Sequence, residues 1–264
     1  MADASEIHPT AVVAQGARLG ARLRLGPYAV IEPDTVLGDD CEIRAHVTLK
    51  RFTSLGASNT VHENAVLGGE PQDVGFVGDT SALQIGNGNR IREGVTIHRG
   101  SAAGSITRVG SECFLMAGAH IAHDDVIGDR VVLANNVALA GHVTIGEGAF
   151  LSGGVVVHQY CRIGRLAMLG GNSKVVQDCL PFVITDGVPA RARALNLVGL
   201  RRAGLGADDV RTLREAFRLL LRSGLALQEA LERLTALQDP NVDELVAFAR
   251  GSKRGFARTH PAAH

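Results

Sequence analysis

Residues 109–180 divide into twelve blocks of six: VGSECF, LMAGAH, IAHDDV, IGDRVV, LANNVA, LAGHVT, IGEGAF, LSGGVV, VHQYCR, IGRLAM, LGGNSK and VVQDCL. Every block begins with Val, Ile or Leu, and the next residue is most often Gly or Ala. A period of six fits neither a helix face nor an alternating strand. It is typical of a parallel β-helix, in which short strands meet at regular corners and the first residue of each block points inward.

The same frame extends over most of the chain. Counting in sixes from Ile7 to Val175 gives 29 positions, of which 26 hold Ile, Leu or Val. The exceptions are Asp73, Asp79 and Ala103, and all three lie in stretches rich in Gly, Ser and polar residues. These stretches interrupt the coil without shifting its frame, so we interpret them as loops.

We therefore predict an all-β solenoid over residues 1–186, with excursion loops at about 68–84 and 98–108. Loops on a repeat array often carry the binding chemistry, because the array itself must keep its repeat. The two interruptions are the first indication of where a functional site lies.

Residues 187–264 have a different pattern and are predicted to form a C-terminal α-helical domain. From Asp208, apolar residues recur at intervals of three and four, which predicts a helix that stops near Gly224. Further helices are predicted over about 227–237 and 242–248. These helices either cap the open end of the solenoid or pack against a neighbouring chain. The final stretch, GSKRGFARTHPAAH, is predicted to be loose.

The composition limits the classes of function. The N-terminal sequence has no basic segment followed by an apolar run, and no stretch of about 18 apolar residues follows, which predicts a cytoplasmic protein without membrane insertion. The four cysteines are scattered without CxxC spacing, which favours a structural role. Basic residues are in excess only after residue 189, and nowhere densely enough to indicate nucleic-acid binding. This basic end could steer an acidic partner or could simply be a solvated helical surface.

A polar ladder is predicted along one edge of the coil. If three hexads complete one turn, residues 18 apart stack on successive rungs. His123 then lies below Gly141, which lies below Gln159, and His142 and His158 flank this column. His120 lies around the corner on the rung of His123, and the loop that begins at His98 leaves close by.

Such a ladder can perform acyl transfer to an alcohol. A neutral imidazole can remove a hydroxyl proton, and a carboxylate such as Asp124 can orient the ring. The backbone N–H of Gly141, which no side chain shields, can stabilise an oxyanion. Two other interpretations remain at this point: the histidines hydrogen-bond between rungs, or they bind zinc. The spacing of His120 and His123 sends these side chains around a corner, which disfavours zinc.

The chain resembles the acyl-carrier-protein-dependent UDP-N-acetylglucosamine O-acyltransferases, which begin lipid A synthesis. The resemblance covers almost the whole sequence. It rests on IHPTAVV, GGEPQD, IREGVTIHRG, AHIAHD, LANNVALAGHVTIG, VHQYCRIG and the GLRR segment. It implies a left-handed β-helix, a homotrimer with active sites between subunits, and no cofactor or metal. The implied donor is an (R)-3-hydroxyacyl group on acyl carrier protein.

The resemblance also implies roles for individual residues. His123 matches the general base that deprotonates the sugar 3-hydroxyl, Asp124 its partner, and Gly141 the oxyanion-hole amide. The residues that match positions contacting the sugar, acyl or nucleotide groups are Gln72, Asp73, His98, His120, His142, Gln159, Asn196 and Arg202. Gly171 matches the position that limits acyl-chain length, and a glycine there predicts a longer chain.

Three positions depart from the family pattern. Gly75 stands where a lysine is usual, Val198 where a glutamate is common, and Ala203 where a second arginine follows Arg202. All three losses fall on the side that holds the nucleotide. They predict weaker binding of UDP-N-acetylglucosamine, compensation by Arg201, or a variant sugar such as a 3-amino derivative.

Three other functions remain open from the sequence. The first is a related N-acyltransferase, which usually carries a separate uridine-binding domain before its coil. The second is a γ-carbonic-anhydrase-like zinc protein. The third is a trimeric solenoid scaffold without catalytic activity.

Overall fold

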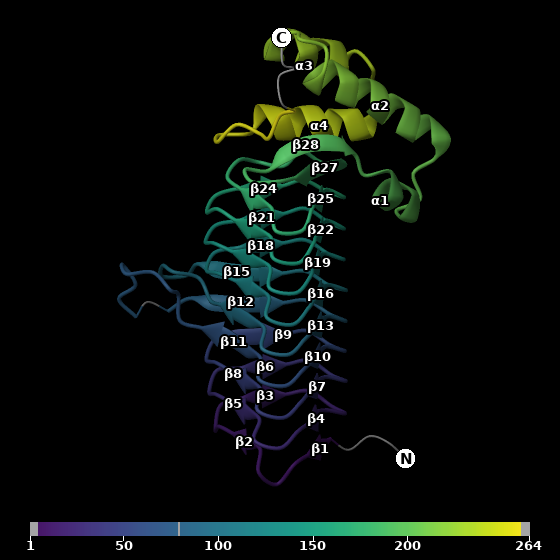
Figure 1. The fold of residues 1–264 in the computed structure, drawn as a ribbon. Helices are drawn as coiled ribbons and strands as arrows, with labels where there is room; N and C mark the ends of the chain where they lie inside the picture. The colour runs from purple at the N-terminus through teal and green to yellow at the C-terminus, as the bar shows by residue number, and fades with distance from the viewer. Residues whose placement is uncertain (1–4, 79, 260–264) are drawn as a thin grey trace.

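The computed structural model describes residues 5–78 and 80–259, which form a three-sided prism with helices stacked on one end (Figure 1). Each side of the prism is a sheet of short strands. The 11-stranded sheet contains β1 (Glu6–Ile7), β4 (Arg24–Leu25), β7 (Glu42–Ile43), β10 (Thr60–Val61), β13 (Arg90–Ile91), β16 (Phe114–Leu115), β19 (Val132–Leu133), β22 (Phe150–Leu151), β25 (Met168–Leu169), β27 (Val183–Asp186) and β28 (Arg191–Leu195). The 9-stranded sheet contains β2 (Val12–Val13), β5 (Val30–Ile31), β8 (Thr48–Leu49), β11 (Val66–Gly69), β14 (Thr96–His98), β17 (His120–Ile121), β20 (Ala138–Leu139), β23 (Val156–Val157) and β26 (Lys174–Val175). The 8-stranded sheet contains β3 (Arg18–Leu19), β6 (Val36–Leu37), β9 (Thr53–Leu55), β12 (Ala82–Ile85), β15 (Ile106–Val109), β18 (Val126–Ile127), β21 (Thr144–Ile145) and β24 (Arg162–Ile163).

The register of the strands confirms that one turn of the coil takes 18 residues. His120 pairs with Ala138 in parallel strands. Where the chain leaves the coil, the partners lie further apart in sequence: Thr60 pairs with Arg90 across the first loop, and Thr96 with His120 across the second. Compared with the 18 residues of one turn, the first loop adds two hexads and the second loop adds one. The repeat therefore resumes in frame, which explains why one count in sixes fits both sides of each loop.

The interior of the prism is a column of aliphatic side chains. The first residue of each hexad points inward, as shown by Ile31, Leu67 and Ile121, which are fully buried. The fifth residue also faces the interior, where space is limited and small side chains fit. The four cysteines are buried free thiols, which agrees with a structural role, and burial raises the pKa of each. They are Cys41, Cys113, Cys161 and Cys179.

The C-terminal part contains four helices: α1 (Leu197–Arg202), α2 (Ala207–Leu221), α3 (Leu227–Thr235) and α4 (Pro240–Arg250). The sequence predicts α2, α3 and α4 to within a few residues. In α2, the apolar side chains at helical spacing are buried, and the Asp209 carboxylate accepts the Gly206 N–H at 2.8 Å. In α4, the Asp239 side chain caps the first turn and Pro240 occupies its first position. Helix α1 was not predicted, because it has only six residues.

The helices cover the end of the prism, as one of the two predicted arrangements requires (Figure 1). Strand β27 pairs with β25 of the coil, and β28 folds back against β27 in an antiparallel hairpin. The predicted boundary between residues 186 and 187 falls inside this hairpin. Helix α4 is joined to the coil through Glu244, whose Oε2 accepts from Nε of Arg165 at 2.8 Å.

The prediction of a loose C-terminal stretch is wrong for residues 251–259. Asp178 donates its N–H to the Gly255 carbonyl at 3.0 Å and accepts the Ala257 N–H at 2.8 Å. Phe256 between them is 5% exposed and packs in the core of the helical end. The buried Phe256 ring and the backbone hydrogen bonds to Asp178 hold residues 251–259 in place, although the polar composition of this segment predicts that it is unstructured. Residues 260–264 lie outside the described part of the chain.

Candidate active site

The candidate site lies on the corner between the 9-stranded and 8-stranded sheets, where β17 turns into β18. His123 and Asp124 occupy this corner, and Asp124 adopts a left-handed conformation with φ of 62°. Aspartate tolerates this conformation better than most residues. Nδ1 of His123 lies 2.8 Å from Oδ2 of Asp124. With the Nδ1 proton donated to the carboxylate, Nε2 is left as the basic nitrogen.

Asp124 is held by Ser101 from the second excursion loop. Ser101 donates its hydroxyl to Oδ2 at 2.6 Å and its N–H at 3.1 Å, and the Asp124 N–H is accepted by the Thr107 hydroxyl at 2.8 Å. Burial alone would raise the pKa of Asp124, but the hydrogen bonds from Ser101 and His123 outweigh burial and hold this pKa below its usual range. The carboxylate is therefore charged at neutral pH and fixed toward the imidazole.

Gly141 lies directly over the His123 ring, one rung further along the coil. A Cβ on Gly141 would lie 2.5 Å from Cε1 and 2.7 Å from Nε2 of His123, so any side chain here would displace the imidazole. The Gly141 carbonyl accepts the Tyr160 N–H, whereas its own N–H donates to no group within residues 5–78 and 80–259. The corner thus presents a basic nitrogen beside an unused backbone donor.

Two further pairs of aromatic rings surround this corner. His142 stacks on Tyr160 with ring centroids 4.7 Å apart, and its Nε2 lies 3.7 Å from Oδ2 of Asp124. His98 and His120 meet edge to face at 5.1 Å. Burial, with smaller contributions from His120 and His123, lowers the pKa of His98 to about 4, and burial also lowers that of His120. Both rings are therefore neutral at pH 7, and the buried Nδ1 of His98 has no hydrogen-bond partner among the described residues.

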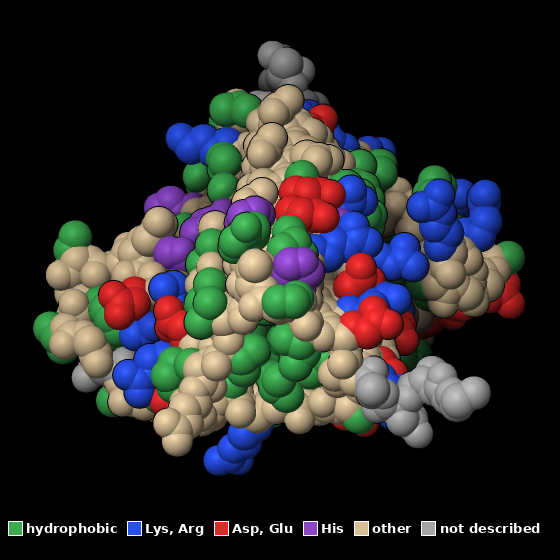
Figure 2. Space-filling model, turned by 90° about the horizontal axis from the view of Figure 1, so that it is seen from below, with side chains coloured by type: hydrophobic (Ala, Val, Ile, Leu, Met, Phe, Trp, Pro, Cys, Tyr) green, Lys and Arg blue, Asp and Glu red, His purple; other side chains and the backbone are tan. Residues whose placement is uncertain are grey.

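The predicted histidine ladder is thus largely correct in geometry. Seen from the N-terminal end of the prism, several histidine side chains lie together and one lies apart from them near the middle of the view (Figure 2). Acidic and basic side chains are intermixed on the same view rather than separated by sign. The sequence did not reveal Ser101, Thr107 or Tyr160. For the first two the signal was available, because the second loop was predicted to leave the coil near His123.

The remaining predicted residues form no hydrogen bond with His123 in the described part of the chain. Gln72 and Asp73 are exposed on the first loop, where Oδ1 of Asp73 accepts the Gly75 N–H at 2.8 Å. Gln159 is exposed one rung beyond Gly141. Asn196 directly precedes α1 and Arg202 is its last residue, and α1 lies on the opposite side of the prism from the loops (Figure 1).

Asn196 has a structural role in addition to any contact with a substrate. It is 7% exposed and caps α1, accepting the Gly199 N–H at 3.0 Å and donating Nδ2 to the Leu166 carbonyl at 2.9 Å. Arg202 is exposed at the end of α1. The cap therefore fixes where α1 starts, and with it the position from which Arg202 extends.

Among the described residues, two groups of side chains could coordinate a metal ion. In one group, the ligand atoms of His123, Asp124 and His142 lie within 4.8 Å of one another, and two imidazoles with a carboxylate form a set that zinc accepts. However, Oδ2 of Asp124 already receives the His123 ring and two donors from Ser101. Binding a metal would break these hydrogen bonds, so the geometry favours a base held by its carboxylate.

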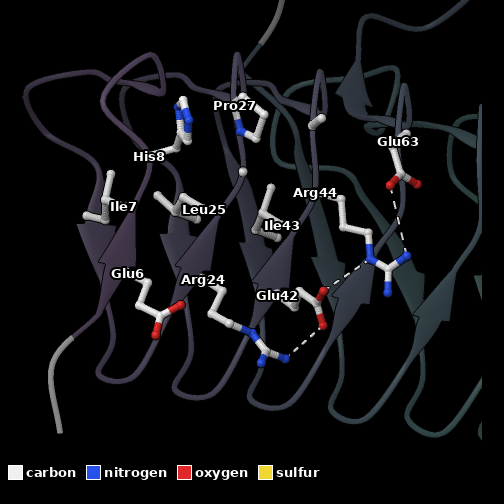
Figure 3. A pocket seen from close by; sticks show the side chains of 12 residues that line it. Glu6, Ile7, His8, Arg24, Leu25, Pro27, Glu42, Ile43, Arg44 and Glu63 are labelled. Atoms are coloured by element: carbon white, nitrogen blue, oxygen red, sulfur yellow. Dashed lines mark hydrogen bonds and ion pairs between the residues drawn. The ribbon is translucent and has the colours of Figure 1, made fainter. Parts of the chain in front are cut away.

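The second group, His62, Glu63 and Glu93, belongs to a set of paired surface charges. Arg92 binds both carboxylate oxygens of Glu93 at 2.9 and 3.0 Å. Below it, a hollow on the first rungs is crossed by a similar chain, in which Glu42 contacts Arg24 at 2.9 Å and Arg44 at 3.1 Å (Figure 3). The carboxylates of Glu42 and Glu93 are therefore neutralised by neighbouring arginines.

Comparison with known proteins identifies the family. The bacterial transferase hexapeptide model matches residues 16–51, and the model for the second domain of UDP-N-acetylglucosamine O-acyltransferase matches residues 178–257. UDP-N-acetylglucosamine O-acyltransferase from Moraxella catarrhalis is 41% identical, covering 96% of this chain and 99% of its own, with a TM-score of 0.92. The Bacteroides fragilis and Arabidopsis enzymes are 35% and 34% identical, each covering 96% of this chain and 100% of their own, with TM-scores of 0.93 and 0.86. The chain belongs to the UDP-N-acetylglucosamine acyltransferase family.

Membership of the UDP-N-acetylglucosamine acyltransferase family confirms two predictions. The protein is an acyltransferase, and its fold is a left-handed parallel β-helix with C-terminal helices. The match also favours acyl transfer over the zinc-protein and scaffold interpretations. Among the helices in the described part of the chain, none has the length and apolar character needed to cross a membrane.

Proposed function

We propose that this acyltransferase moves an (R)-3-hydroxyacyl group from acyl carrier protein to the 3-hydroxyl of UDP-N-acetylglucosamine, in lipid A biosynthesis. One observation carries the proposal: the imidazole of His123, oriented by Asp124 at 2.8 Å, lies against Gly141, whose N–H has no acceptor among the described residues. Acyl transfer to an alcohol requires a base and an oxyanion donor placed side by side.

The chemistry proceeds through one tetrahedral intermediate. Nε2 of His123 removes the proton of the sugar hydroxyl as its oxygen attacks the thioester carbonyl, and Asp124 stabilises the imidazolium that forms. The Gly141 N–H donates to the developing oxyanion. When the intermediate collapses, the C–S bond breaks and the imidazolium returns its proton to the departing carrier thiolate. No cofactor is needed to balance this sequence.

The neutral histidines and the first loop complete the proposed substrate site. Because His98 and His120 are uncharged at pH 7, they can donate or accept hydrogen bonds to sugar hydroxyls without attracting anions. His142 and Gln159 are exposed further along the same corner. Gln72 and Asp73 are assigned to the sugar and acyl side because their loop leaves the coil at this corner.

The position of α1 supports a homotrimer with sites between subunits. Asn196 and Arg202, which we assign to the nucleotide, lie on the opposite side of the prism from the loops (Figure 1). They can serve the same site as His123 only if a second copy supplies them. Residues 190–264 carry an excess of basic side chains. This charge supports the C-terminal helical end as the docking surface for acyl carrier protein, which is acidic, in the cytoplasm.

Steady-state kinetics with purified protein and an (R)-3-hydroxyacyl carrier protein tests the proposal. We expect UDP-N-acetylglucosamine to be acylated, with a KM above the low-micromolar range. Gly75 and Ala203 stand where the family pattern has a lysine and an arginine. Each charge-assisted contact to the nucleotide contributes roughly 1.5–3 kcal/mol, so losing two of them weakens binding. A kcat/KM at least about tenfold higher for the 3-amino analogue would instead identify the variant sugar, and no transfer to either acceptor would refute the proposed reaction.

Gly171 is proposed to set the length of the acyl chain. A Cβ on Gly171 would meet the Gly153 carbonyl at 3.5 Å, an ordinary contact, so the backbone leaves room for a side chain to begin there. We expect Gly171→Met to shift the preferred donor to a chain shorter by several carbons, at unchanged KM for the sugar nucleotide. Competition between donors of different length measures this preference. An unchanged preference would remove Gly171 from the acyl site.

A further inference from the structure

A carboxyl group is buried inside the prism directly behind the candidate site. Asp125 is fully buried and occupies the fifth position of its hexad, which faces the interior. Its neighbours in the same column, Thr107 one rung before and Val143 one rung after, are also fully buried and carry no charge. An uncharged residue therefore fits this position, and nothing in the repeat requires a carboxyl group.

Keeping an acid at this position costs stability. Burial raises the pKa of Asp125 to about 8, against the opposing effect of two backbone hydrogen bonds. Because the folded chain binds this proton more tightly than the unfolded chain does, the fold becomes progressively less stable as the pH rises from the ordinary aspartate pKa to about 8. A residue kept at such a cost needs a compensating role.

The contacts of Asp125 indicate what that role is. Its Oδ2 accepts the N–H of Ala122 at 3.1 Å, and its Oδ1 accepts the N–H of Val143 at 2.7 Å. Ala122 directly precedes His123, and Val143 directly follows His142 in the turn that begins at Gly141. One carboxyl group therefore joins the backbone of two successive turns, one carrying the base and the other the oxyanion donor.

We propose that Asp125 is a positioning residue that fixes the distance between Nε2 of His123 and the N–H of Gly141. This inference rests on the proposed function of these two groups. Asp125 touches neither of them and acts only through the two turns. The His123 ring fills the space that a Cβ on Gly141 would occupy. Because the ring and the Gly141 backbone approach so closely, their separation has to be held constant. A misplacement of about 1 Å at such a site can cost about 10²-fold in rate.

Two substitutions at Asp125 test the clamp. Asp125→Ala removes both acceptors, and we expect kcat to fall by about 10²-fold while KM for both substrates stays within about threefold. Asp125→Asn keeps one acceptor and places an NH₂ group against the other N–H, so we expect an intermediate loss of about tenfold. A partial rescue of kcat by the conservative variant distinguishes a clamp from a general packing defect.

Asn59 provides a matched control. It is also a fully buried fifth-position residue that links two rungs, since its Oδ1 accepts the Asn89 N–H and the Asn89 amide at 2.9 Å each. No candidate catalytic residue lies on its turns. We expect Asn59→Ala to lower the midpoint of thermal unfolding without changing kcat per folded enzyme.

Crystal structures of the Asp125 variants separate this inference from the proposed reaction. The proposal requires the turns at His123 and Gly141 to move apart in Asp125→Ala, whatever substrate the enzyme uses. Unmoved turns would overturn it, as would a kcat within about twofold of the unmodified protein. If the unmodified protein transfers no acyl group but the turns separate in the variant, the reaction assignment fails and the clamp stands.

Discussion

Replacing His123 by alanine is expected to lower kcat for acyl transfer by about 10²–10⁴-fold, with little change in KM for either substrate. Nε2 of His123 is left free to accept a proton, because Nδ1 is held by Asp124 at 2.8 Å. A residual rate should remain, because the Gly141 N–H and substrate positioning are intact. The measurement is steady-state kcat and KM with acylated carrier and sugar nucleotide.

His158→Ala is the control for the histidine substitution. His158 lies one rung beyond His142 and is exposed, and among the described residues its ring makes one hydrogen bond, with the backbone carbonyl of Gln159 at 3.1 Å. We expect kcat of this variant to stay within about threefold of the unmodified protein. If both variants kept full activity, His123 would not be the base. If both lost activity equally, the effect would belong to the ladder as a whole.

Replacing Gly141 by alanine is expected to lower kcat by about 10²–10³-fold. The methyl group would lie 2.5 Å from Cε1 of His123, so the ring has to leave its place beside the amide and lose its alignment with Asp124. The backbone at Gly141 is not in the left-handed region, so alanine causes no conformational strain there. The expected loss is therefore catalytic, and the midpoint of thermal unfolding should change little.

The double variant His123→Ala with Gly141→Ala tests the cause of that loss. Once the ring is removed, the new methyl group meets nothing at 2.5 Å, so Gly141→Ala should reduce the rate much less than in the unmodified protein. Gly153→Ala is the matched glycine control, since its Cβ would meet only the Asn135 carbonyl, at 3.4 Å. Additive losses in the double variant would show that Gly141 acts independently of the ring.

Much of the fold could be predicted from the sequence because its physical cause is local and periodic. Each hexad specifies its own strand, corner and inward residue, and the loops add whole hexads, so the count from Ile7 to Val175 remains valid across both. The amphipathic pattern of α2 likewise depends on residues close in sequence. The left-handed sense of the coil came only from family resemblance, since a period of six is compatible with either hand.

The core of the site could be predicted for the same reason. A turn of 18 residues places His123 and Gly141 in one column, and their contact confirms it. The support for this pair was not predictable. Ser101 reaches Asp124 through a loop whose path no repeat dictates. The hexad frame points Asp125 inward, but the sequence does not show that its carboxyl group bonds the turns of both His123 and Gly141.

The sequence by itself determined the repeat, the two places where it is interrupted and the column that holds His123 and Gly141, because periodic spacing alone controls these features. Only the tertiary structure decided which groups fix them in place. These groups are Ser101, which bonds Asp124, Asp125, which bonds two successive turns, and Phe256, which packs on the helical end. Their contacts depend on how the corners, the loops and the C-terminal segment pack together, which no periodic spacing controls.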